Sequence, residues 1–75
     1  MIRELDCVVL TADLPDHSLR AGDVGTVVLE HGSDGYEVEF ATLGGETVAV
    51  LTLRSDQVRP IAQDEILHAR RVEAA

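Results

Sequence analysis

Two glycines, Gly22 and Gly25, lie three residues apart immediately before the β-branched run at residues 26–28. Glycine adopts backbone angles with φ > 0 without steric penalty, whereas Thr and Val favour extended backbone. The pattern therefore predicts that the chain turns sharply at both glycines and then enters a strand of a small, strongly bent barrel.

Five short segments have the composition of β-strands. In the clearest of them, Tyr36, Val38 and Phe40 alternate with Glu37 and Glu39, the period of a strand with one dry and one wet face. The predicted strands are residues 6–11, 24–30, 36–40, 46–53 and 57–59. A long loop at residues 12–20 separates the first two, while turns at Gly35 and at Gly44-Gly45 connect the next ones, and Pro60 ends the last.

The last part of the chain has a different pattern. Acidic residues at 64–65 precede Ile66 and Leu67, and Arg70-Arg71 follow, a charge order that suits the helix macrodipole. A helix of about ten residues is marginal alone, so it must pack Ile66, Leu67, Ala69 or Val72 against an apolar surface. The predicted fold is mainly β, a five-stranded SH3-like barrel at residues 1–61 followed by a short C-terminal helix and tail at 62–75.

Composition restricts the functions that this chain can perform. Fourteen acidic residues against six arginines and no lysine give a formal net charge of −8, which opposes binding to phosphate backbones. Cys7 is the only cysteine, so no internal disulfide can form, and its apolar surroundings predict a buried thiol. The N-terminus has no long apolar segment, so we expect neither a signal peptide nor a membrane span. We therefore expect a cytoplasmic protein.

No arrangement of residues predicts catalysis, a metal or a cofactor. The three histidines and Cys7 lie in four different predicted elements, without the close pairs typical of zinc sites. Ser18 follows His17 only as a neighbour in a turn, and Glu37 and Glu39 share the solvent face of a strand. We therefore expect no catalytic, cofactor-binding or metal-binding residue and no small-molecule substrate.

The motifs at residues 14–17, 22–28 and 36–40 support a resemblance over nearly the whole chain. Together they resemble a small bacterial family described only as a domain of unknown function. They are also similar to the KOW-type, SH3-like barrels of transcription and ribosomal proteins and to the barrel of the nitrile hydratase beta subunit. The similarity to KOW-type barrels implies nucleic-acid or protein contacts through the loop at residues 31–35, where this chain has no Lys or Arg. The similarity to the nitrile hydratase beta subunit implies an accessory subunit of a larger enzyme.

These observations favour a non-enzymatic protein-binding module that self-associates or binds a basic protein, such as a toxin in an antitoxin-like or immunity-like pair. A KOW-like nucleic-acid-binding domain and an accessory enzyme subunit are the alternatives. Tyr36 is the one candidate for stacking on a base. The candidate partner-binding residues are Asp13, Asp16, Asp23, Tyr36, Ile66, Leu67 and Arg70, and the candidate structural residues are Gly22, Gly25, Gly35, Gly44 and Gly45.

Overall fold

The computed structural model describes residues 1–32 and 34–72, and its regular structure is a single antiparallel sheet. The strands are β1 (Cys7–Leu10), β2 (Val24–Glu30), β3 (Tyr36–Ala41), β4 (Thr47–Leu53) and β5 (Val58–Pro60). Two short 3₁₀ turns, η1 (Pro15–His17) and η2 (Ser55–Gln57), interrupt the loops before β2 and β5. The spatial order is β4-β3-β2-β1-β5, so only β1 and β5 are neighbours that are far apart in sequence.

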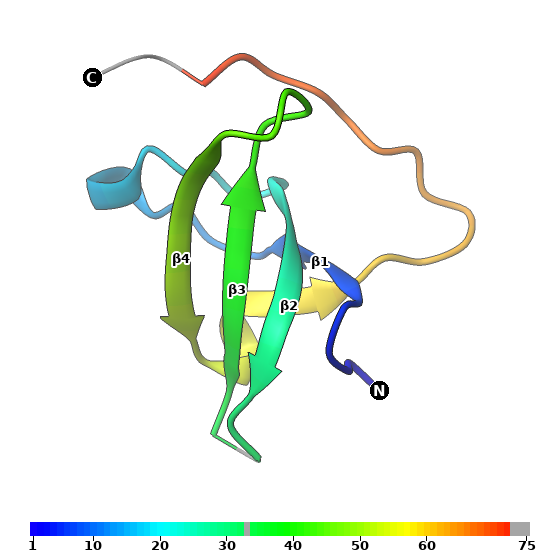
Figure 1. Ribbon diagram of the computed structural model, residues 1–75. Coiled ribbons are helices and arrows are strands. Elements are labelled where there is room, and N and C mark those ends of the chain that lie inside the picture. Colours follow the sequence, from blue (N-terminus) through cyan, green and yellow to red (C-terminus); the bar gives the residue numbers. More distant parts are fainter. Residues whose placement is uncertain (33, 73–75) are drawn as a thin grey trace.

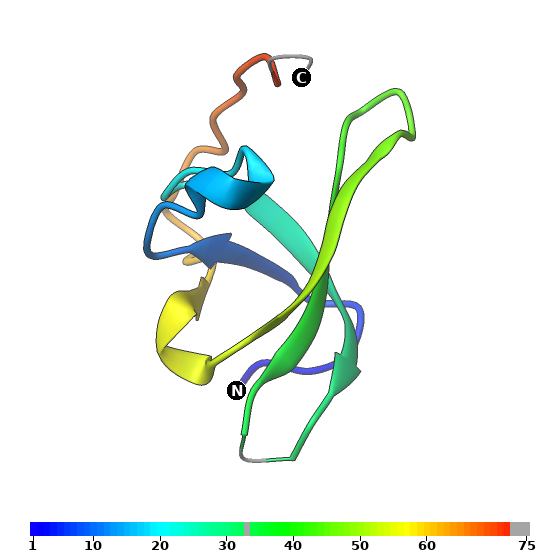
Figure 2. The same cartoon turned by 90° about the vertical axis from the view of Figure 1, so that its left-hand side faces the viewer.

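The sheet bends strongly around its own core. β2, β3 and β4 lie side by side, and β1 and β5 run across behind them (Figure 1). Seen from the side of β4, the two parts face one another (Figure 2). Between them lies the buried core, which consists of Ile2, Val8, Leu10, Leu19, Val27, Val38, Phe40, Leu53 and Val58. Because Phe40 is the only ring among these residues, the core is built almost entirely from aliphatic side chains.

Apolar and acidic side chains alternate along β3, and this alternation decides which face of the strand is buried. Val38 and Phe40 are buried, whereas Glu37 and Glu39 are only partly covered on the opposite face. Val28 has no direct partner on β3, because the register shifts between Val27 and Leu29. Such a bulge re-aims the side chains beside it, and Val28 and Leu29 are both exposed.

The strands predicted from sequence are present, and the bounds of β2 agree with the prediction at both ends. Gly22 has φ +97°, as expected for a turn before β2. The prediction of a second left-handed turn at Gly25 was wrong, because Gly25 is not among the residues with positive φ. A Cβ there would lie 2.6 Å from Val38 Cγ1 and 2.8 Å from Phe40 Cε1. Gly25 therefore provides space for the core rather than a turn.

Two other predictions were wrong. Cys7 is exposed, because it begins β1 just before the strand becomes buried at Val8. Residues 62–72 contain no helix. The side chains of Ile66 and Leu67 remain 95% and 63% exposed, so the segment lacks the apolar contact that a helix of this length requires.

The sheet has two free ends in its strand order. β4 and β5 stand at these ends and do not pair with each other, so the sheet is open among the described residues. Closure into an SH3-like barrel therefore stays a prediction. No helix in the described part of the chain is long and apolar enough to cross a membrane.

The position of Gly25 gives a first prediction. Gly25→Val should destabilise the domain by about 1–3 kcal/mol, because the new side chain would overlap Val38 and Phe40 in a packed core. Gly44→Ala is the matched control, since Gly44 lacks a positive φ and the nearest atom to an added Cβ is 3.8 Å away. Urea unfolding measures both variants. Equal stability of G25V and the wild type would contradict the packing role.

Candidate functional site

The loop before β2 folds back on itself and presents polar groups at one end of the sheet. Leu14 and Leu19 form an antiparallel bridge, with η1 between them. Leu19 is buried in the core, and Asp13 Oδ1 accepts a hydrogen bond of 2.8 Å from the Ala21 N–H. The Gly22 N–H then donates to the Leu10 carbonyl at 2.9 Å. These contacts hold the loop against β1 immediately before β2 begins.

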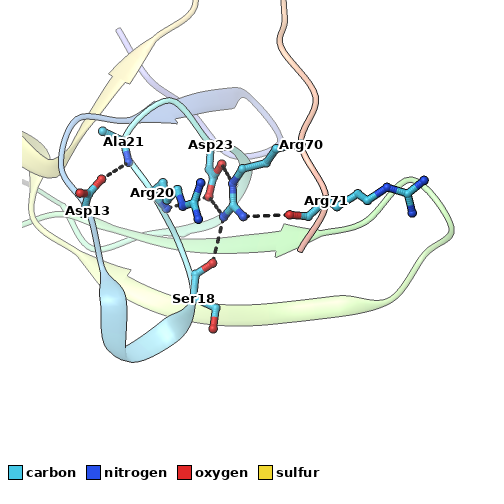
Figure 3. Close-up of polar contacts among 7 residues, drawn as sticks. All are labelled: Asp13, Ser18, Arg20, Ala21, Asp23, Arg70 and Arg71. Atoms are coloured by element: carbon cyan, nitrogen blue, oxygen red, sulfur yellow. Dashed lines mark hydrogen bonds and ion pairs between the residues drawn. The ribbon is translucent and has the colours of Figure 1, made fainter. Parts of the chain in front are cut away.

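Asp23 is the polar centre of this loop. Its Oδ2 accepts a hydrogen bond of 2.8 Å from the Arg20 N–H, which closes a turn over residues 20–23. The Arg70 guanidinium approaches the same carboxylate from the C-terminal segment, with Nε 2.8 Å from Oδ1 and Nη2 2.5 Å from Oδ2. Nη2 also donates to the Ser18 carbonyl at 2.9 Å (Figure 3). A carboxylate and a carbonyl therefore bind one guanidinium in the paired geometry that arginine favours.

This ion pair is less exposed than the others in the described chain. The side chains of Asp23 and Arg70 are 16% and 24% exposed. Burial acts to raise the pKa of Asp23, but hydrogen bonds from the Arg70 side chain and the Arg20 N–H, with the charges of both arginines, outweigh it. The pKa of Asp23 therefore lies below its ordinary value of 3.8.

A second ion pair fixes the start of the C-terminal segment. Arg59 Nη1 and Nη2 each donate to Glu65 at 2.7 Å, and Glu65 Oε1 also accepts a hydrogen bond of 2.7 Å from the Ala62 N–H. The hydrogen bonds from Arg59 and Ala62 lower the pKa of Glu65 to about 2. The segment at residues 61–72, which we call the tail, is thus held at both ends by arginine and carboxylate groups.

A groove of about 850 Å³ lies between the tail and the β3–β4 hairpin. Leu19, Val24, Phe40 and Val48 contribute apolar lining from the domain, and Asp23 contributes its carboxylate. Leu43 at the hairpin tip and Leu67 on the tail line the groove and are exposed. The groove therefore combines apolar lining with an acidic group at which a guanidinium binds.

The structure brings together only some of the predicted partner-binding residues. Asp23 and Arg70 form the ion pair, and Asp13 supports the same loop. Asp16 is exposed on η1. Ile66 and Leu67 belong to the tail, but not to a helix.

Tyr36 lies away from this site. It pairs with Glu30 at the far end of β2 and is partly buried against the core, so it is not a free stacking surface.

The contact of the Ser18 carbonyl with Arg70 and the contact of Arg59 with Glu65 were not predicted from the sequence. The Ser18 carbonyl carries no signal of its own in the sequence.

Within residues 1–32 and 34–72, no group of three His, Cys, Asp or Glu side chains is arranged to hold a metal ion.

The lowered pKa of Asp23 predicts a pH-dependent contribution to stability. Above the ordinary pKa the ionised Asp23 contributes fully, and protonation removes that contribution as the pH falls through the folded-state pKa. Asp23→Asn should therefore cost about 1–3 kcal/mol at neutral pH, and this difference from the wild type should shrink below about pH 4. Urea unfolding across this range measures it.

Asp16→Asn is the matched control, because Asp16 is exposed and should change stability by less than about 0.5 kcal/mol. A cost of D23N that stays constant down to pH 2 would show that ionisation of Asp23 is not what stabilises the loop.

The contact between Arg59 and Glu65 gives a separate prediction. In the wild type the carboxyl group of Glu65 should titrate near pH 2, and Arg59→Gln should move its pKa toward the ordinary value of 4.5. Carboxyl NMR resonances report both values. Arg54→Gln removes the exposed ion pair of Arg54 with Asp56. It is the control and should leave the pKa of Glu65 unchanged. A wild-type pKa near 4.5 would contradict the tail anchor.

Comparison with known proteins places the folded part of the chain in a family. No curated protein and no solved structure shows significant similarity to it. A family model described as a domain of unknown function, DUF4926, matches residues 4–60, from the turn before β1 to the end of β5. The tail, including Arg70, lies outside the matched region. The chain therefore belongs to the DUF4926 family.

Proposed function

We propose that this chain is a non-enzymatic protein-binding module whose partner is a basic protein. The observation that carries the proposal is the set of hydrogen bonds from the Arg70 guanidinium to the Asp23 carboxylate and the Ser18 carbonyl. Arg70 comes from a segment without helix or strand, so the site binds an arginine presented by irregular backbone. We infer that an arginine on an extended segment of the partner binds Asp23 in the same way.

The surroundings of Asp23 support a protein partner. The groove beside it offers apolar side chains at Val24, Phe40 and Val48 next to the acidic group, a combination that suits a segment with both an arginine and an apolar residue. The net charge of −8 attracts a basic protein and repels nucleic acid. A basic toxin bound by an acidic partner is one class of complex with this chemistry.

The tail then acts as a tethered competitor for the site. A short tether presents its own end at an effective concentration in the millimolar range, so a partner must bind more tightly than Arg70 does. The family match ends at residue 60, so the proposed receptor belongs to the family domain and its competitor lies outside it. We also infer that the bent sheet is a partly open SH3-like barrel, in which β4 and β5 do not pair with each other and the long connection before β2 forms the binding loop.

The test uses the full-length chain with Arg70→Gln, which empties the site. The probe is a synthetic peptide with the sequence of residues 62–72, and the control peptide carries Gln in place of Arg70. We expect the probe to shift the amide NMR signals of residues 18–24 and 40–44. Loss of its charged hydrogen bonds should weaken the control peptide about tenfold or more.

Two further variants make the result specific. Asp23→Asn combined with Arg70→Gln should abolish the shifts, whereas Asp16→Asn combined with Arg70→Gln should retain them. A short single-stranded RNA is the competing probe and should produce no shifts even at low salt. Shifts caused by RNA, or equal binding of the two peptides, would overturn the proposal.

A further inference from the structure

The outer edge of β4 is a second surface with unused hydrogen-bonding capacity. β4 is at one end of the sheet and pairs with β3 on one side only. In an antiparallel strand, alternate residues direct their N–H and C=O groups to opposite sides, so about half of these groups on β4 face away from β3. From the side of β4, no described segment crosses in front of the strand (Figure 2).

Apart from one register irregularity near its beginning, β4 lacks the features that usually protect such an edge. Residues Thr47–Leu53 have the sequence Thr-Val-Ala-Val-Leu-Thr-Leu, with no charge, proline or glycine. The register irregularity with β3 lies at its beginning, opposite Phe40 and Ala41, and the pairs from Ala49 to Leu53 are regular. By contrast, β5 at the other end of the sheet has three residues and contains Arg59 and Pro60. Charge, proline and short length prevent strand addition at β5, whereas β4 permits it.

We propose that β4 pairs antiparallel with β4 of a second copy of this chain, around a two-fold axis at Val50. In this register Val50 faces Val50 of the other copy, Ala49 faces Leu51, and Val48 faces Thr52. Ala49 and Leu51 are partly buried hydrophobic residues packed against the core. The added strand would cover their exposed flank and satisfy the outward N–H and C=O groups of both copies.

Charge opposes a second copy less at this edge than at the acidic loop before β2. Two copies, each with a net charge of −8, repel one another, but β4 itself is uncharged. The nearest outward carboxylate on β3 is that of Glu39, which pairs with Val50. The two Glu39 residues would lie three strand spacings apart, about 14 Å, farther than the Debye length of about 8 Å at physiological ionic strength. Their repulsion is therefore largely screened.

The proposed contact is limited to one strand from each copy. Interfaces of this kind lie at the small end of the range for specific association, so we expect a reversible, concentration-dependent dimer. Sedimentation velocity on the full-length chain across a wide range of concentration measures it. The wild type should shift from monomer to dimer as the concentration rises. A monomer at every concentration would overturn the proposal.

Variants at Val50 test the position of the interface. Val50 is 48% exposed, and Val50→Thr, an uncharged β-branched control, should retain the dimer. Val50→Lys places two positive charges opposite each other, which should weaken dimerisation about tenfold or more. The new lysine also lies beside Glu39 of its own chain, so folding should be retained, and thermal unfolding followed by circular dichroism checks this. Equal dimerisation of V50K and V50T would place the interface elsewhere and overturn the proposal.

A charge-swap experiment completes the test. Val50→Lys and Val50→Glu should each be more monomeric than the wild type, and an equimolar mixture should form a heterodimer. Absence of the heterodimer, with both variants folded, would contradict the register. Asp23→Asn should dimerise like the wild type, because the proposed interface does not involve the arginine site. Failure of one proposal is thereby distinguished from failure of the other.

Discussion

The carboxylate of Asp23 connects the loop before β2 with Arg70 of the tail, 47 positions away in sequence. It accepts a hydrogen bond from the Arg20 N–H in the loop and binds Arg70 from the tail. Asp23 itself stands directly before Val24, the first residue of β2. Moving a carboxylate out of water is costly unless hydrogen bonds and charge compensate it. Here the Arg70 guanidinium and one backbone N–H supply that compensation, so the loop, the start of β2 and the tail are fixed relative to one another.

Much of the fold could be predicted from local pattern, because strands and turns are encoded by neighbouring residues. The alternation from Tyr36 to Phe40 and the β-branched run after Gly25 gave strands close to those observed. The prediction of a turn at Gly25 was wrong for a physical reason. Its lack of a side chain is required by Val38 and Phe40 across the sheet, and no local rule reports such a contact.

The tail shows where local rules fail. Its charge order is that of a helix, yet Glu65 and Arg70 bind Arg59 and Asp23 instead. Charges that would complement a helix dipole are worth at most about 1 kcal/mol each on an exposed surface, and the side chain of Ile66 is 95% exposed, so its burial does not stabilise a helix. The sequence identified Asp23 and Arg70 as candidate binding residues, but their contact spans 47 positions and leaves no periodic signal.

The distribution of charge separates two kinds of surface on this small domain. Acidic groups gather in the loop before β2 and on the outward face of β3, where their charge favours positively charged groups and opposes negatively charged ones. β4 has neither charge nor proline, although it lies at the end of an open sheet. Such an edge favours association with another strand unless something protects it. In the two interactions that we propose, the same negative charge favours a basic ligand at Asp23 and leaves the uncharged edge of β4 as the surface where two copies can meet.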